Sequence, residues 1–275
     1  MTSPSSSPPP SLDLFDDTDF YPPTPPPTTA SYTTAAGETL TLRLVGHSPL
    51  EAHHLWNGAR VAAAHLEAHA AALVAGRAVL ELGAGAGLPS LVAAARGARV
   101  VVATDFPDPD LLENLWRNVR ACTLLPPAAD PDARAGNIVA RGYVWGADPA
   151  PLLACVPPAP PGEEEGQEQR KFDVVVLADL LFRHSEHGRL LDSVGATLKR
   201  ARAARALVFF TSYRPWLAHK DLAFFDRARA RGLAVDKLFE RRMDRPLFAD
   251  DPGDEEVRRT VLAYALRWPD EACCA

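Results

Sequence analysis

Apolar positions along the chain alternate between the spacing of strands and the spacing of helices. Compact apolar runs at 78–82, 99–104 and 173–178 are each followed by a segment whose apolar residues recur at helical intervals. Strands with nearly continuous apolar residues are typical of a parallel sheet covered on both faces. The last two expected strands, at 234–239 and 257–268, have no helix between them, so they should form an antiparallel pair.

The complete pattern predicts an α/β fold with a Rossmann-like seven-stranded sheet, mostly parallel, with helices on both faces and the antiparallel pair at its terminal edge. Further strands are expected at 39–45, 137–144 and 206–212, and helices at 50–73, 88–95, 110–121, 218–232 and from the strand at 173–178 to 202. Asp108 or Asp110 is expected to cap the helix at 110–121, because a carboxylate accepts hydrogen bonds from the free N–H groups of a first turn.

Proline and charge set two segments apart from the rest of the 275 residues. Residues 1–42 hold five acids and no Lys or Arg, so they carry most of the net charge of −6. Fifteen of the 26 prolines lie in a leader or in one insertion, where proline interrupts no helix or ladder hydrogen bond. We predict a partly disordered acidic leader at 1–36, a single domain at 37–269 with a disordered insertion at 147–170, and a tail at 270–275.

Composition also excludes several classes of protein. A net charge of −1 on the 233 residues after the first 42 argues against a basic nucleic-acid binder. The first ten residues lack the basic and apolar regions of a secretory signal, and no run of about 20 apolar residues is present to span a membrane. We therefore expect no membrane anchor and no direct contact with nucleic acid.

The cysteines and histidines do not follow the spacing of a metal site. Cys122, Cys155, Cys273 and Cys274 contain no Cys-x-x-Cys pair, which argues against a zinc site or a disulfide framework and favours the reducing cytoplasm. His53, His54, His65 and His69 decorate the expected helix at 50–73. Without carboxylate or cysteine partners at ligand spacing, they are interpreted as solvated or capping residues, and no metal is predicted.

The most informative segment is Val79-Leu80-Glu81-Leu82-Gly83-Ala84-Gly85-Ala86-Gly87-Leu88. An apolar strand runs into glycines at every second position and then into a helix, and glycine lets the backbone turn sharply and approach a ligand. The spacing Gly-x-Gly-x-Gly differs from the Gly-x-Gly-x-x-Gly that places a pyrophosphate on a helix, which disfavours an NAD-dependent dehydrogenase. Glu81 would repel a pyrophosphate but favour a cationic amino-acid group.

A second acid completes this signal. Asp105 ends the Val-rich strand at 99–104 and follows Gly83 by 22 residues, a place from which a carboxylate accepts both hydroxyls of a ribose. A nucleoside that carries a positive amino-acid group satisfies Glu81 and Asp105 together. The two motifs therefore point to S-adenosylmethionine as the cofactor.

With these motifs the sequence resembles a seven-β-strand, class I methyltransferase over roughly residues 38–268. Glu81–Gly87 matches the first motif of that family, Asp105 matches its ribose-binding acid, and the expected antiparallel pair matches the edge of its sheet. This resemblance implies the fold and the cofactor already expected from the residues.

Other segments narrow the resemblance. His53-His54-Leu55-Trp56-Asn57-Gly58-Ala59-Arg60, Asp179-Leu180-Leu181-Phe182 and the leader segment Asp19–Pro27 are similar to those of fungal protein N-terminal and lysine methyltransferases that modify translation elongation factor 1-alpha. These belong to a wider group of lysine methyltransferases with an Asp-x-x-Tyr/Phe motif, and fungal members have also been described as nicotinamide N-methyltransferase-like. The insertion at 147–170 is not part of the pattern.

The resemblance implies the following site residues. Cofactor binding falls to Trp56, Gly83, Ala84, Gly85, Asp105, Trp145 and Ala178, and Asp179 and Phe182 occupy the catalytic Asp-x-x-Phe positions. An indole can stack on adenine or lie near a sulfonium, although Trp145 also fits a plain core aromatic. Asp179 can accept hydrogen bonds from an amine and Phe182 can wall its channel; the competing interpretation is a helix cap and a packing residue. Tyr213 to Trp216 is a weaker candidate for the substrate lip.

The expected activity is methyl transfer from S-adenosylmethionine to the N-terminal α-amino group, or to a nearby lysine, of elongation factor 1-alpha. Two alternatives stay open: an N-methyltransferase of a small amine such as nicotinamide, and a non-catalytic nucleoside-binding module with the same fold. The sequence indicates neither the acceptor residue nor the oligomeric state.

Overall fold

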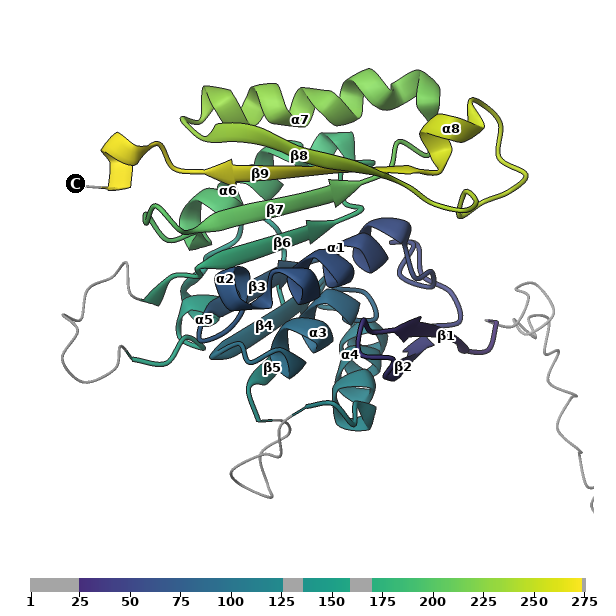
Figure 1. Ribbon diagram of the computed structural model, residues 1–275, viewed down its shortest axis with the longest axis horizontal. Helices are drawn as coiled ribbons and strands as arrows, with labels where there is room; N and C mark the ends of the chain where they lie inside the picture. Colours follow the sequence, from purple (N-terminus) through teal and green to yellow (C-terminus); the bar gives the residue numbers. More distant parts are fainter. Residues whose placement is uncertain (1–24, 126–135, 159–169, 274–275) are drawn as a thin grey trace, which may run out of the picture.

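The computed structural model describes residues 25–125, 136–158 and 170–273 (Figure 1). The predicted leader therefore lies mostly outside the described residues, including Asp19 to Thr24 of the segment that resembles relatives. The same holds for 159–169 of the predicted insertion and for the last two residues. Among the described helices, none has both the length and the apolar character needed to cross a bilayer.

A seven-stranded sheet forms the centre of the molecule, in the order β5-β4-β3-β6-β7-β9-β8. Its strands are β3 (Ala78–Leu82), β4 (Val100–Asp105), β5 (Ile138–Gly142), β6 (Val174–Ala178), β7 (Arg205–Phe210), β8 (Ala234–Arg242) and β9 (Thr260–Arg267). The first five are parallel, whereas β9 runs antiparallel to both β7 and β8. The predicted fold class is confirmed, including the antiparallel pair at one edge.

Helices cover both faces of this sheet, as Figure 1 shows for α1 and α3 lying across one of them. The helices are α1 (Asn57–Ala68), α2 (Ala70–Leu73), α3 (Leu88–Ala95), α4 (Pro109–Ala121), α5 (Ala150–Leu153), α6 (His187–Thr197), α7 (Ala218–Ala230) and α8 (Glu255–Arg258), with 3₁₀ turns at His184–Glu186, Pro215–Leu217 and Asp270–Cys273. Alternate strand residues separate the two layers. Val79 packs in the cluster with α1 and α3, whereas Leu80 packs in the cluster with α6 and α7.

A two-stranded hairpin, β1 (Thr28–Thr33) and β2 (Thr39–Leu44), precedes the sheet. The hairpin is fixed to α4 through Arg43, whose backbone N–H donates to Oδ1 of Asn118 at 2.8 Å and whose carbonyl accepts from Nδ2 of Asn114 at 2.9 Å. Strand β1 lies inside the predicted leader. A Cβ at Gly46 would fall 1.6 Å from the carbonyl oxygen of Pro25, so the incoming chain lies directly against the segment that follows β2.

Two predicted helix boundaries are wrong. Helix α1 begins at Asn57 and not at Leu50, because Glu51 has a left-handed backbone with φ of 62° and Trp56 is extended. Helix α6 ends at Thr197 because Leu198 turns into a bridge with Phe172. The first part of the predicted insertion, 147–158, is described and contains α5, whose Leu152 is 1% exposed.

Candidate functional site

A cavity of about 380 Å³ opens at the carboxyl ends of β3, β4 and β6. Strand β3 has β4 on one side and β6 on the other, so the strand order reverses here. Open α/β sheets bind their ligands at such a topological switch point. The volume lies in the range of small-molecule sites. The structure brings all nine sequence-predicted site residues into the lining of this one cavity: Trp56, Gly83, Ala84, Gly85, Asp105, Trp145, Ala178, Asp179 and Phe182.

The glycine-rich turn after β3 forms the floor of the cavity. Gly83 and Gly85 have left-handed backbones, with φ of 66° and 54°, which favour glycine. A Cβ at Gly83 would lie 2.6 Å from Cδ2 of Leu180, whereas one at Gly85 would meet no atom within 4 Å. A side chain at Gly83 would therefore displace the end of Leu180, whereas Gly85 leaves open space in which a ligand can approach the main chain.

Asp105 joins the end of β4 to this turn. Its Oδ2 accepts a hydrogen bond from the N–H of Gly85 at 2.6 Å, and its Oδ1 accepts one from the N–H of Phe106 at 2.7 Å. Burial raises the pKa of the Asp105 carboxyl, and the two N–H groups oppose that shift. Each carboxylate oxygen keeps a second lone pair, so Asp105 can still accept hydrogen bonds from a ligand.

Glu81 is a second buried carboxyl beneath the turn, with 1% of its surface exposed. Its Oε2 accepts hydrogen bonds from the N–H, at 3.0 Å, and the hydroxyl of Ser90 in α3. Burial raises the pKa of Glu81 to about 8, against the opposing effect of these hydrogen bonds. Glu81 also lines the cavity. A cationic ligand group would therefore find there an acid whose ionised form it stabilises.

Asp179 also lines the cavity and directly follows β6. Its Oδ2 accepts a hydrogen bond from the N–H of Gly58, in the first turn of α1, and its Oδ1 accepts one from the N–H of Thr211 at 2.9 Å, after β7. The side chain thus connects three elements. Burial raises the pKa of Asp179 to about 7, because desolvation outweighs the hydrogen bonds that stabilise the carboxylate.

Aromatic rings form a wall beside Asp179. The rings of Trp56 and Phe182, both in the cavity lining, lie parallel within 11° with centroids 5.8 Å apart. Tyr213 meets Trp56 edge to face at 5.1 Å, and Phe248 does so at 5.6 Å. Burial, followed by the charge of Asp179, raises the pKa of Tyr213 well above its usual range. These rings place apolar surface beside the carboxyl group.

Two histidines hold the segment that carries Phe182. His184 Nε2 lies 2.7 Å from Oδ1 of Asp221 in α7, and Oδ2 of the same residue accepts a hydrogen bond from the hydroxyl of Ser212 at 2.8 Å. His187 is buried, with Nε2 2.7 Å from the carbonyl oxygen of Leu181. These contacts hold the segment that follows Phe182 against α7 and the end of β7, and they thereby limit the positions that Phe182 can adopt.

Several contributors to the site were not predicted from the sequence. Phe106, which follows Asp105, is 49% exposed yet lines the cavity, as does Val144 before Trp145. An aromatic residue directly after the acid that ends β4 is a sequence signal that could have identified Phe106, whereas none marks Val144. Phe248 comes from the long connection between β8 and β9. Its carbonyl accepts a hydrogen bond at 2.7 Å from Nη1 of buried Arg258, and no local motif marks that contact.

Solved structures with a related fold support this architecture. A transferase of Pyrococcus horikoshii aligns with 88% of this chain and 73% of its own, with a TM-score of 0.51 and 17% identity. P. horikoshii TYW2, solved in complex with MeSAdo, aligns with 88% of this chain and 72% of its own, with a TM-score of 0.50 and 16% identity. At such identities the likeness concerns the fold alone.

Sequence comparison identifies the family. A family model described as lysine methyltransferase matches residues 38–152, which include the glycine-rich turn and Asp105. A Neurospora crassa protein, named protein N-terminal and lysine N-methyltransferase efm7, is 56% identical to this chain over 94% of this chain and 88% of its own length. The chain therefore belongs to the family of protein N-terminal and lysine N-methyltransferases, enzymes that methylate protein.

Proposed function

We propose that this chain transfers methyl groups from S-adenosylmethionine to translation elongation factor 1-alpha, at the N-terminal α-amino group or at a nearby lysine. One observation carries the proposal: a single cavity is lined by one group formed by the glycine-rich turn, Asp105 and Glu81, and by a second group formed by Asp179, Trp56 and Phe182. The first group of residues suits a cationic nucleoside, and the second suits an amine that must lose its proton.

The first group, formed by the glycine-rich turn, Asp105 and Glu81, fits S-adenosylmethionine. Asp105 would accept the ribose hydroxyls, Gly85 would allow the main chain to approach the ligand, and Glu81 would balance the positive methionine part. Phe106 and Trp145 offer apolar surface to the adenine. The complex of TYW2 with MeSAdo supports such a ligand on this fold. When bound, the cofactor supplies an activated methyl group, so the protein need not provide a covalent nucleophile.

The second group, Asp179 and the rings beside it, fits an amine acceptor. Nδ2 of Asn57 is buried and has no hydrogen-bond partner among the described residues. Asn57 directly precedes Gly58, whose N–H donates to Asp179. Because buried polar atoms rarely stay unpaired, Nδ2 of Asn57 favours a polar ligand at this place. The neighbouring rings of Trp56 and Phe182 would strip water from the amine and orient it.

The pKa of the acceptor amine determines how much Asp179 must contribute to removing its proton. An α-amino group has a pKa of about 8, so a substantial fraction is already neutral near neutral pH, whereas lysine has a pKa of about 10.4 and needs more help. With a pKa raised to about 7, Asp179 is placed to accept a hydrogen bond from the amine and to take up its proton. The α-amino group is therefore the less demanding acceptor.

The identity of the protein substrate rests on the resemblance of Trp56, Asp179 and their neighbouring residues to those of elongation factor methyltransferases. A cytoplasmic location follows from that substrate. It also agrees with Cys122, Cys155 and Cys273, which are free thiols in the structure.

The test uses purified full-length protein, S-adenosylmethionine with a labelled methyl group, and unmodified elongation factor 1-alpha. We expect label in the elongation factor, none with the Asp105→Ala variant, and none in free nicotinamide. Label in nicotinamide without a protein acceptor would instead support a small-molecule enzyme. Absence of transfer to the elongation factor by a preparation that binds the cofactor would overturn the proposed substrate.

A further inference from the structure

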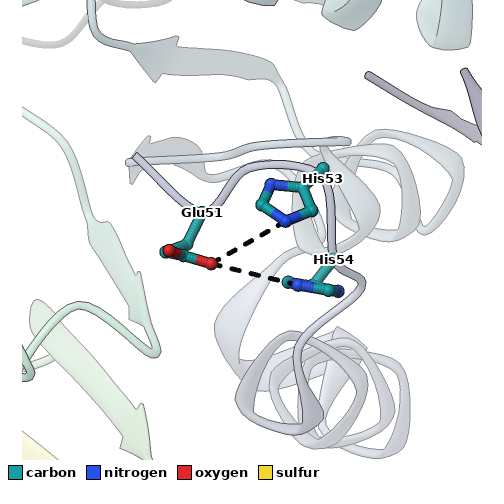
Figure 2. A group of neighbouring side chains, drawn as sticks. All are labelled: Glu51, His53 and His54. Atoms are coloured by element: carbon teal, nitrogen blue, oxygen red, sulfur yellow. Dashed lines mark ion pairs between the residues drawn. The ribbon is translucent and has the colours of Figure 1, made fainter. Parts of the chain in front are cut away.

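One carboxylate and two imidazoles meet beside the cavity, in the segment between β2 and α1. Figure 2 shows that Glu51 faces both His53 and His54; its Oε2 lies 3.9 Å from Nε2 of each ring. One donor atom from each of the three residues can be chosen so that all lie within 4.8 Å of one another. The sequence predicted solvated or capping histidines here because no carboxylate partner was evident, but the turn between β2 and α1 supplies one.

The backbone of this segment is fixed by hydrogen bonds. The N–H of Glu51 donates to the carbonyl of Ser48 at 3.0 Å, and the carbonyl of Glu51 accepts from Nε1 of Trp56 at 3.0 Å. Glu51 also has a left-handed backbone, with φ of 62°. The side chains of Glu51, His53 and His54 are therefore carried by a turn whose backbone is held in place.

The two histidines offer ring nitrogens as ligands. Nδ1 of His53 is buried and has no hydrogen-bond partner among the described residues. Nε2 of His54 faces Glu51, and an imidazole nitrogen is a common ligand of divalent transition metals. The side chain of Glu51 is 46% exposed and can adjust. Tetrahedral Zn²⁺ with bonds of about 2.0–2.2 Å separates its ligands by about 3.4 Å. The two 3.9 Å distances to Glu51 must then shorten by about 0.5 Å, and the separation of the two imidazole donors, which is at most 4.8 Å, by no more than about 1.4 Å.

We propose that Glu51, His53 and His54 bind a divalent transition-metal ion of the Zn²⁺ type, and that the bound ion inhibits methyl transfer. Two imidazoles and one carboxylate are a ligand set that Zn²⁺ accepts, with the fourth position left for water. The ring of His47 lies 5.4 Å from that of His53 and offers a further nitrogen beside the cluster.

Inhibition follows from the position of the cluster, and this part rests on the proposed function. Glu51 and His54 line the cavity, and the ring of His54 contacts Phe248 at 5.0 Å and Trp56 at 5.9 Å. A bound ion would hold both side chains in place and add positive charge beside the cavity. An acceptor amine arrives mostly as an ammonium ion, so the ion would repel it. Inhibition should therefore be competitive with the protein acceptor.

The binding test is a calorimetric titration of the full chain with Zn²⁺. Loss of an outer-shell partner already weakens metal binding by about 10- to 100-fold, so His53→Ala and Glu51→Gln should each weaken it at least that much. His69→Ala is the matched control, since His69 is an exposed histidine outside the cluster. All variants keep the four cysteines, so binding by thiols cannot produce the difference.

Titration with Co²⁺ gives a second readout, because its visible absorption reports ligand type and geometry. We expect the spectrum of the wild type to persist in His69→Ala and to be lost in His53→Ala, with unchanged circular dichroism spectra. Equal Zn²⁺ affinity in the wild type and in folded His53→Ala would overturn the site.

The activity test uses His53→Ala because His53 does not line the cavity. This variant should methylate like the wild type without metal and should resist Zn²⁺ concentrations that inhibit the wild type, with chelator restoring the wild-type rate. Equal inhibition of both proteins would overturn the inhibitory role. If no methyl transfer were found at all, the proposed function would fail while the calorimetric result still decided the metal site.

Discussion

Replacing Gly58 by alanine tests whether its backbone N–H positions Asp179. Gly58 is the second residue of α1, where alanine would ordinarily stabilise a helix by up to about 1 kcal/mol. Here the added Cβ would lie 2.5 Å from Oδ2 of Asp179 and 3.0 Å from the carbonyl oxygen of Phe209. Neither atom can move freely, because Asp179 is buried and Phe209 belongs to β7.

Two costs oppose the gain in helix propensity. A weakened hydrogen bond to a buried carboxylate costs about 1.5–3 kcal/mol, and overpacking costs about 1–3 kcal/mol. The net effect of Gly58→Ala is then a loss of about 2–5 kcal/mol in the free energy of unfolding, together with a fall in kcat from the displaced carboxylate.

The assay is urea unfolding followed by circular dichroism, with methyl transfer measured on the same preparations. Gly195→Ala in α6 is the matched control, since a Cβ there meets no atom within 4 Å and should stabilise the protein by about 0.5–1 kcal/mol. If Gly58→Ala were as stable and as active as Gly195→Ala, the assigned role of the Gly58–Asp179 contact would be refuted.

Three further predictions follow from the same site. Asp105→Asn should weaken S-adenosylmethionine binding by about 10- to 100-fold in a calorimetric titration, since charge-assisted hydrogen bonds contribute about 1.5–3 kcal/mol, whereas unchanged affinity would remove Asp105 from the cofactor site. Phe248→Ala should raise KM for the protein acceptor, because Phe248 supports Trp56 and does not line the cavity, and an unchanged KM would show that Phe248 does not position that wall. Glu81 binds its proton more tightly in the folded than in the unfolded chain, so the free energy of unfolding should fall as pH rises towards its folded pKa of about 8. Urea titrations at several pH values should show a smaller fall for Glu81→Gln than for the wild type. An equal dependence on pH in both proteins would contradict the raised pKa of Glu81.

The parts of the site that the sequence predicted depend on local chain geometry. Gly83 and Gly85 follow an apolar strand directly, and Asp105 ends the next strand, so their meeting at the sheet edge requires only parallel pairing of β3 and β4. Asp179 was placed by the same rule at the end of β6, although its bond to Gly58 spans 121 positions and could not be foreseen.

The missed features depend on contacts between distant segments. Phe248 reaches Trp56 across most of the chain, and nothing near residue 248 indicates that contact. Strand β1 was assigned to the leader because its Thr and Ser residues resemble the Pro/Ser/Thr-rich residues before it, and its residues stay half-buried or exposed. Helix α5 was missed because prolines surround the buried Leu152 and Val156, which lie four residues apart.

Fragmentation mass spectrometry of elongation factor 1-alpha, from cells with the enzyme, without it, and with the Asp179→Asn variant in its place, decides whether this chain modifies that protein. We expect methyl groups on the N-terminal α-amino group or on a nearby lysine with the enzyme, none without it, and a strongly reduced level with Asp179→Asn. The same methylation in cells that lack the enzyme would contradict the proposed function.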